Sequence, residues 1–226
     1  MSEHPAIIAA LPREVKGLVH GWTERRLRGH VHVYTRDSAV VACAGMGAAR
    51  VALAVEAALA AGPVTALLSV GLAGACDPAL QVGDVIRAGT VVDSRTGERF
   101  EKAEFRQVLV TADGIASVRE KARLYAAYGA AAVDMEAATV ARLAQAHGLD
   151  FQAIKVISDA ADFELADLGR FATADGQFRE TAFALHAALR PQLWKKLMLL
   201  AGNSGKALAA LTDALNKELD WYRERA

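Results

Sequence analysis

Two carboxylates lie in apolar surroundings where they could act together on a sugar. Asp159 follows Ser158 at the end of an apolar, β-prone run over residues 151–157, which predicts a buried strand that delivers a carboxylate at its C-terminal end. Ligands of open α/β sheets bind at such strand ends. Glu136 follows Met135 at the start of an alanine-rich helix, where burial of a charge without donors is costly. The pair predicts a site that holds sugar hydroxyls and protonates a leaving group.

A third acid and two glycine-bearing turns add to this set. Glu14 follows the N-terminal apolar run, where an acid in a first helical turn can serve only to offset the helix dipole. The turns, Gly45-Met46-Gly47 and Gly71-Leu72-Ala73-Gly74, come after predicted strands, and glycine lets backbone N–H groups approach an anion or a sugar oxygen. Neither turn has the spacing of a dinucleotide fingerprint, so an ordinary strand–helix turn also explains each of them.

Composition and charge exclude several classes of protein. The chain has 226 residues, of which 53% are hydrophobic and 23% charged, which is typical of a globular domain with a sizeable core. Lys plus Arg equals Asp plus Glu, at 26 each, so nothing favours a nucleic-acid partner. The two cysteines, Cys43 and Cys76, stand beside small apolar residues and are expected to be buried in a reducing compartment. With no secretory signal or membrane-spanning run, we expect a cytoplasmic protein.

The elements that must position these residues alternate between strands and helices. Strands are predicted over residues 6–11, 30–35, 39–44, 66–70, 85–92, 105–111 and 151–157, and helices over 13–20, 48–61 and from Glu136 to 147. This alternation predicts an α/β fold with three layers, α/β/α, around a central sheet. Because some strands alternate polar and apolar residues, we expect the sheet to be mixed.

The C-terminal part differs in kind. We predict a catalytic domain over residues 1–177 and a helical extension over 178–226 that packs on the same domain, with breaks at Pro191 and at residues 202–205. The segment Trp194–Leu200 is both apolar and basic. It can be a core-packing helix with solvated lysines, or it can dock on a membrane surface or accept an apolar ligand.

Five short segments, in their order along the chain, resemble those of a known superfamily. It is the nucleoside phosphorylase/nucleosidase superfamily, of the purine nucleoside phosphorylase and methylthioadenosine/S-adenosylhomocysteine nucleosidase type. The segments are residues 10–15, 45–47, 70–74 followed by Val82-Gly83-Asp84, 133–137, and 157–162. The resemblance implies that fold and cleavage of the N-ribosidic bond of a purine nucleoside. It implies no metal and no organic cofactor, with phosphate as a possible co-substrate.

The resemblance also implies a role for each residue that matches. Asp159 would protonate the departing purine, Glu14 would orient or deprotonate an attacking water, and Glu136 with Met135 would hold the ribose. The remaining substrate-binding candidates are Asp134, Ser158, Gly45, Met46, Gly47, Leu72, Ala73, Gly74 and Ile115, and the candidate phosphate ligands are Arg13, Arg50 and Lys155.

Three departures from the family pattern keep alternatives open. Leu72 stands where a Ser or Thr often contacts the nucleophile, and it has no side-chain donor. Lys155 stands where an Arg is common, and it lacks the planar fork. The aromatic residue that stacks on the base in methylthioadenosine enzymes is replaced near Ile115. Hydrolysis, phosphorolysis and a nucleoside-binding module without catalysis all remain possible readings.

The C-terminal segment resembles the hopanoid-associated branch of the superfamily. That resemblance implies a substrate with a large apolar 5′ substituent, such as adenosylhopane, from which adenine would be released. It implies further that Trp194–Leu200 contacts the inner face of the membrane peripherally. The family resemblance implies a homo-oligomer.

Overall fold

The computed structural model describes residues 5–37, 39–164 and 191–225, and for residues 191–200 it describes the backbone alone. Its strands are β1 (Pro5–Ala9), β2 (Thr23–Leu27), β3 (Val31–Arg36), β4 (Ala39–Cys43), β5 (Ala66–Ala75), β6 (Val85–Asp93), β7 (Arg99–Glu101), β8 (Gln107–Thr111), β9 (Ala130–Asp134) and β10 (Asp150–Asp159). Its helices are α1 (Pro12–Val15), α2 (Ala48–Leu59), α3 (Val118–Tyr128), α4 (Ala137–Ala146) and α6 (Pro191–Arg223).

The described strands form one mixed sheet, part of which closes on itself. β1 lies between β4 and β5 and is parallel to both, and β3 and β2 continue outward from β4 as antiparallel strands. β5 also pairs with β10, and the order then runs through β6, β8 and β9 back to β5. The strands that end near the site therefore come together from both parts of the sheet.

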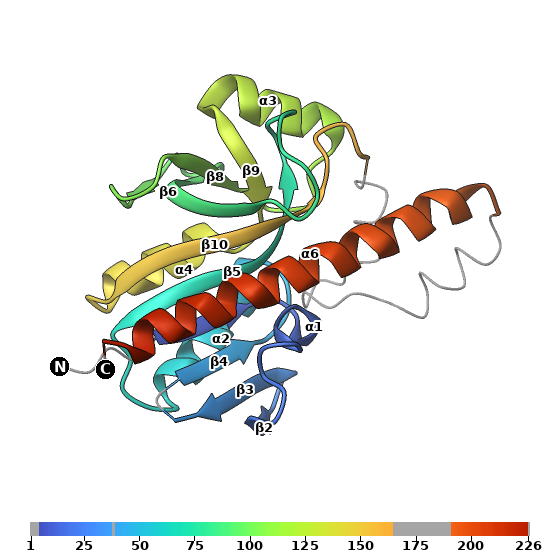
Figure 1. Ribbon diagram of the computed structural model, residues 1–226. Helices are drawn as coiled ribbons and strands as arrows, with labels where there is room; N and C mark the ends of the chain where they lie inside the picture. Colours follow the sequence, from blue (N-terminus) through green and yellow to red (C-terminus); the bar gives the residue numbers. More distant parts are fainter. Residues whose placement is uncertain (1–4, 38, 165–190, 226) are drawn as a thin grey trace.

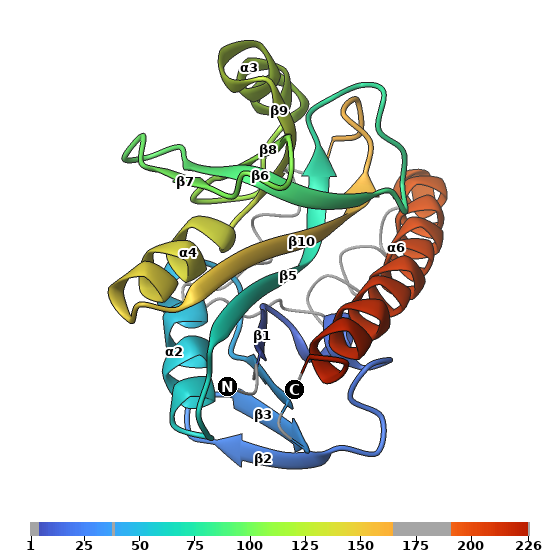
Figure 2. The same cartoon turned by 60° about the vertical axis from the view of Figure 1, so that its left-hand side comes forward.

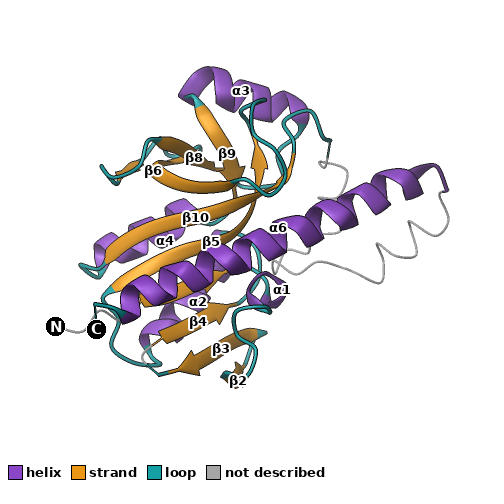
Figure 3. Ribbon diagram, in the orientation of Figure 1, coloured by secondary structure: helices purple, strands orange, loops and turns teal. Residues whose placement is uncertain are grey.

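Helices cover both faces of the sheet, which confirms the predicted three-layer arrangement (Figures 1 and 2). α2 and α4 lie on one face, and the long α6 crosses the other, as the colouring by element type also shows (Figure 3). In β1, Ile7 faces the side of α6 and packs in one core with Leu211, whereas Ile8 faces α2 and packs in another with Val55. A strand buried on both faces reads as a continuous apolar run, which is why β1 was readily predicted.

The second glycine-bearing segment is a strand and not the turn that its sequence favours. β5 continues through Gly71 to Ala75, and Leu72 pairs there with Val156 of β10. Gly71 has a φ of +135°, which side-chain-bearing residues rarely adopt, and a Cβ on it would lie 2.8 Å from Oε1 of Glu14. The glycine thus marks a close approach of a catalytic candidate to the strand, which the local pattern does not distinguish from a turn.

The C-terminal helix is continuous across the glycines where a break is predicted, so that prediction is wrong. α6 runs from Pro191 to Arg223 over 33 residues, and Pro191 stands at its start, where a missing N–H costs little. Each helical glycine costs about 1 kcal/mol relative to alanine. Burial of Ala207, Leu211 and Leu215 against the sheet outweighs this cost. None of the helices in the part of the chain that the structure describes combines the length and the apolar composition that a membrane span requires.

Other differences between the predicted and the observed elements occur mainly where the apolar periodicity of the sequence is weak. The helix predicted over residues 13–20 is the short α1, and β2, β7, β9 and α3 were not predicted. β2 is exposed along its whole length, and α3 buries only Lys121 and Leu124, so neither has a clear apolar periodicity. The predicted domain boundary at residues 177/178 and the helix predicted from residue 178 to Pro191 lie outside the described residues.

Two matched glycine substitutions test the path of α6. Gly205→Ala should stabilise the protein by roughly 0.5–1 kcal/mol, because Gly205 is helical and a Cβ there meets nothing within 4 Å. Gly17→Ala should destabilise it, because its Cβ would lie 2.6 Å from Oγ1 of Thr212 in α6. Urea unfolding of both variants measures the two effects. A destabilised Gly205→Ala would show that the helix is interrupted there.

Candidate active site

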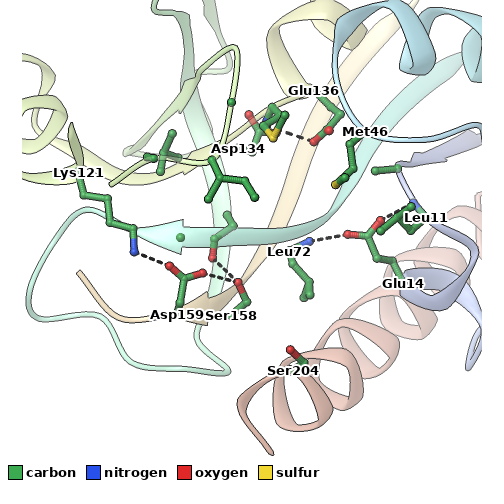
Figure 4. Close-up of a pocket in the computed structure, with 18 of the residues that line it drawn as sticks. Leu11, Glu14, Met46, Leu72, Lys121, Asp134, Glu136, Ser158, Asp159 and Ser204 are labelled. Atoms are coloured by element: carbon green, nitrogen blue, oxygen red, sulfur yellow. Dashed lines mark hydrogen bonds and ion pairs between the residues drawn. The ribbon is translucent and has the colours of Figure 1, made fainter. Parts of the chain in front are cut away.

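A cavity of about 270 Å³ lies at the carboxyl ends of β1, β5, β9 and β10, bounded on one side by α6 (Figure 4). Carboxylates from three separate segments, Glu14, Glu136 and Asp159, reach it. Its walls also carry apolar side chains and short stretches of backbone. The lining residues are Ala10, Leu11, Arg13, Glu14, Met46, Leu72, Ala73, Gly74, Gly114, Ile115, Ala116, Lys121, Val133, Asp134, Met135, Glu136, Ser158, Asp159 and Ser204.

Backbone N–H groups of two segments hold the carboxylate of Glu14. Its Oε2 accepts from the N–H of Leu11 at 2.8 Å, and its Oε1 accepts from the N–H of Leu72 at 3.1 Å. The side chain is buried, with 7% exposure, and it lies against Gly71, where no Cβ stands in the way. Leu72 lacks a side-chain donor, but its main chain fixes Glu14 at the cavity.

The carboxylate of Glu136 is buried at the N-terminal end of α4. Its Oε1 accepts from the N–H of Gly47 at 2.8 Å, and its Oε2 accepts from the N–H of Met135 at 3.3 Å. Burial raises the pKa of Glu136 to about 7; the nearby Lys155 ammonium lowers it, and Asp134 raises it further. With two backbone N–H donors, this carboxylate keeps further capacity to accept hydrogen bonds from a ligand in the cavity.

A buried ion pair between Lys155 and Asp134 lies close to Glu136. Nζ of Lys155 lies 2.9 Å from Oδ2 of Asp134, with exposures of 1% and 0%, and donates to the carbonyl of Val70 at 3.2 Å. Asp134 also accepts from Oγ1 of Thr111 at 2.7 Å and from the N–H of Ala137 at 2.9 Å. Burial opposes the charge of Lys155, but the Asp134 and Glu136 carboxylates outweigh it and raise the pKa of Lys155 above its ordinary value.

The carboxylate of Asp159 is held from both sides (Figure 4). Oγ of Ser158 donates to its Oδ1 at 2.7 Å, and the same hydroxyl lies 3.3 Å from the carbonyl of Ala73. Nζ of Lys121, on α3, forms a short ion pair with its Oδ2. Asp159 has only 3% exposure. Its charge is therefore compensated inside the protein before any substrate binds.

The structure brings most of the predicted substrate-binding residues to the cavity and places the others behind it. Gly45 and Gly47 do not line it, although the N–H of Gly47 reaches Glu136. Of the candidate phosphate ligands, Arg13 lines the cavity. Arg50 donates instead to the carbonyls of Ala44 and Gly29, and Lys155 is enclosed beside Asp134. Neither lies on the cavity wall.

Lys121 and Ser204 line the cavity, yet sequence reasoning missed both. Lys121 stands three positions before Leu124, and this spacing on one face of α3 is the only signal that it is buried. Ser204 comes from the segment where a break in the helix was predicted. In the part of the chain that the structure describes, no group of three His, Cys, Asp or Glu side chains is placed to hold a metal ion.

Solved structures with the same fold come from several bacterial nucleosidases. A futalosine hydrolase mutant of Helicobacter pylori is 21% identical, with a TM-score of 0.63, covering 83% of this chain and 98% of that one. A 5′-methylthioadenosine/S-adenosylhomocysteine nucleosidase of the same organism is 18% identical, with a TM-score of 0.66, covering 95% and 98%. The Neisseria meningitidis nucleosidase of that type is also 18% identical, with a TM-score of 0.66, covering 93% and 98%.

A family model gives the assignment. No curated protein matches the chain. The model described as the phosphorylase superfamily matches residues 4–114 and 105–190, which is most of the sequence. This match confirms the superfamily that the five sequence segments predicted, whereas the hopanoid-associated branch stays a prediction. The chain belongs to the phosphorylase superfamily.

Proposed function

We propose that this protein cleaves the N-ribosidic bond of a purine nucleoside and releases the base. The observation that carries the proposal is the meeting of Glu14, Glu136 and Asp159 at one cavity, each with different partners. A ribosidic bond breaks through a transition state with positive charge on the sugar and negative charge on the base. A set of separated carboxylates can stabilise the first charge, and a proton donor can neutralise the second.

Each carboxylate then has one role. Asp159, held by Ser158 and Lys121, delivers the proton to the purine ring as the bond to the sugar breaks. Glu136 accepts hydrogen bonds from the ribose hydroxyls, with Met135 against the sugar. Glu14, fixed by two backbone N–H groups, orients the nucleophile.

Water is the nucleophile that the cavity favours. The side of the cavity with Glu14 carries a negative charge, which repels phosphate and attracts the protons of a water molecule. Arg13 is the lining cation there, whereas the other two candidate phosphate ligands, Arg50 and Lys155, are engaged away from the cavity. Phosphorolysis, with phosphate bound by Arg13, is the alternative reaction.

The substrate we propose is an adenine nucleoside with an apolar 5′ substituent, such as adenosylhopane. Apolar Leu72 points toward the helix that carries Ser204 (Figure 4), and apolar Leu11 also lines the cavity, so we propose that a long substituent leaves the cavity beside Ser204. Methylthioadenosine and S-adenosylhomocysteine are the alternative substrates. Homo-oligomerisation, cytoplasmic localisation and peripheral membrane contact through Trp194–Leu200, of which the structure describes the backbone alone, are proposed from the sequence alone.

A nucleoside-binding module without catalysis is the second candidate class. The departures at Leu72 and Lys155 motivated it, but each has a compensation here. The Leu72 N–H holds Glu14, the residue that we propose orients the nucleophile, and Lys155 forms an internal pair with Asp134. Both observations favour a working enzyme.

Release of adenine from a panel of adenine nucleosides, with and without phosphate, tests the reaction. We expect release that does not depend on phosphate, and Asp159→Asn should lower kcat by about 10²–10⁴-fold, the usual contribution of a general acid. Circular dichroism checks that the variant is folded. Release that requires phosphate would select phosphorolysis, and no release from any nucleoside would favour the binding module.

The 5′ substituent is tested by comparing kcat/KM for adenine nucleosides whose 5′ alkyl chain grows in steps. We expect kcat/KM to rise with chain length, because each buried methylene adds about 0.8 kcal/mol. Ser204→Trp should remove this rise, since a bulky side chain would fill the exit, while cleavage of a nucleoside with a 5′ hydroxyl is retained. Equal values for short and long chains would overturn the proposed substrate class.

The buried carboxyl of Glu136 predicts opposite effects of pH on stability and on substrate affinity. The pKa of Glu136 is about 7 in the folded protein against an ordinary 4.5, so the folded state holds a proton that the unfolded chain has lost. Its contribution to the free energy of unfolding is therefore complete below pH 4.5 and is lost as pH rises to about 7. Substrate affinity should instead increase through pH 7, because the anion is the better acceptor for ribose hydroxyls.

Glu136→Gln should remove both effects, since its amide does not titrate. Urea unfolding and KM, each measured from pH 5 to 8, provide the comparison with the unchanged protein. If Glu136→Gln shows the same pH dependence of KM as the unchanged protein, another group is responsible.

A further inference from the structure

Lys121 of α3 is buried beside Asp159, the proposed acid. Lysines on helices at the protein surface are normally exposed. Lys121 has 1% exposure and, with Leu124, is one of two buried residues of α3. Removal of an ammonium from water costs several kcal/mol unless charges and hydrogen bonds compensate. A lysine that only covered the core could extend its amine to solvent, so the burial of Nζ indicates a specific task.

All hydrogen-bonding capacity of this ammonium is directed at one segment. Nζ donates to Oδ2 of Asp159, to the carbonyl of Ala160 at 2.9 Å and to the carbonyl of Phe163 at 3.1 Å. An ammonium has three N–H donors, so the three acceptors satisfy it completely. Lys121 thereby connects α3 to the end of β10 and fixes the turn that follows Asp159.

The absence of a side chain at Gly74 leaves room for the pair of Lys121 and Asp159. A Cβ on Gly74 would lie 3.0 Å from Oδ2 of Asp159 and 3.0 Å from Cε of Lys121, so even alanine there would press on both partners. Ser158 holds the second carboxylate oxygen and has a further acceptor in the carbonyl of Ala73. Its hydroxyl can therefore donate to Asp159 when that group is an anion, or turn to Ala73 and accept when Asp159 carries a proton.

We propose that Lys121 is a positioning residue for leaving-group protonation: it orients Asp159 and resupplies the proton that Asp159 gives to the base. This inference rests on the proposed function. As the bond between the sugar and the purine breaks, its electron pair goes to the purine, whose ring nitrogen takes a proton from Asp159. Asp159, a carboxylate in its ion pair with Lys121, first receives that proton from the Lys121 ammonium, which becomes an amine, so Asp159 is again a carboxylate after the transfer. Water forms the new bond to the sugar, and the proton that it loses passes through solvent to Lys121.

A pair of substrates separates this role from a structural one. The purine needs a proton to leave, whereas the nitrophenolate of para-nitrophenyl riboside leaves without one. Lys121→Met should lower kcat for the adenine nucleoside by at least roughly 10²-fold, the lower part of the range for general acid catalysis, and leave kcat for the nitrophenyl riboside within about threefold. Asp159→Asn should give the same pattern.

The control is Lys102→Met. Lys102 also pairs with an aspartate, with Nζ 2.8 Å from Oδ2 of Asp150, but it lies on the surface away from the cavity. The Lys102→Met variant should leave kcat unchanged for both substrates. The double variant Lys121→Met, Asp159→Asn should be no slower than Asp159→Asn alone, because the two residues act as one unit. This double variant also carries no unpaired buried charge, so it remains informative if Lys121→Met by itself does not fold.

The outcomes distinguish this inference from the function on which it rests. If the unchanged protein cleaves neither substrate, the proposed function fails. If it cleaves both and Lys121→Met slows both equally, Lys121 only supports the fold. If Lys121→Met slows neither, or the double variant is markedly slower than Asp159→Asn, Lys121 does not act through Asp159.

Discussion

The buried pair of Lys155 and Asp134 is the interaction on which the site depends. Lys155 comes from β10 and reaches the carbonyl of Val70 in β5, while Asp134 ends β9 and caps the first turn of α4 through Ala137. Three strands and one helix therefore meet at two charges that are removed from water. Separating the pair would leave an uncompensated buried charge, which costs several kcal/mol of stability. The three strands and the helix are therefore fixed relative to one another. That arrangement sets where Glu136 begins α4 and where β10 ends.

The same physical solution is used twice, with different consequences. Lys155 compensates the charge of Asp134 entirely within the protein, while the nearby carboxyl of Glu136 has few hydrogen-bond donors. Lys121 satisfies Asp159 at the cavity wall, where the carboxylate also faces the substrate space. One pair thus lies enclosed in the protein, and the other places a charged group at the cavity wall. In the function that we propose, these different surroundings of the carboxylates separate sugar binding from proton delivery.

The sheet makes this division possible, because its strands deliver their carboxyl ends to one cavity from both sides. β1 leads to Glu14, β9 leads to Glu136, and β10 ends at Asp159. The unusual continuation of β5 through Gly71 brings its backbone N–H groups to the cavity floor, where the N–H of Leu72 binds Glu14. The wall beside these N–H groups is completed by α6, whose described side chains, from residue 201 on, enter the core from Ala207 onward.

The sequence by itself determined the superfamily, most of the buried strands and the positions of three candidate acids, because these depend on local patterns. An apolar run that ends in Ser158-Asp159 is readable without any partner, as is Glu136 at the start of α4. Only the tertiary structure decided which donors meet those acids. The contact of Lys121 with Asp159 spans 38 positions, and that of Leu72 with Glu14 spans 58, so no periodicity within one element can reveal either. The continuous course of α6 through its glycines was decided in the same way, by the sheet against which it packs.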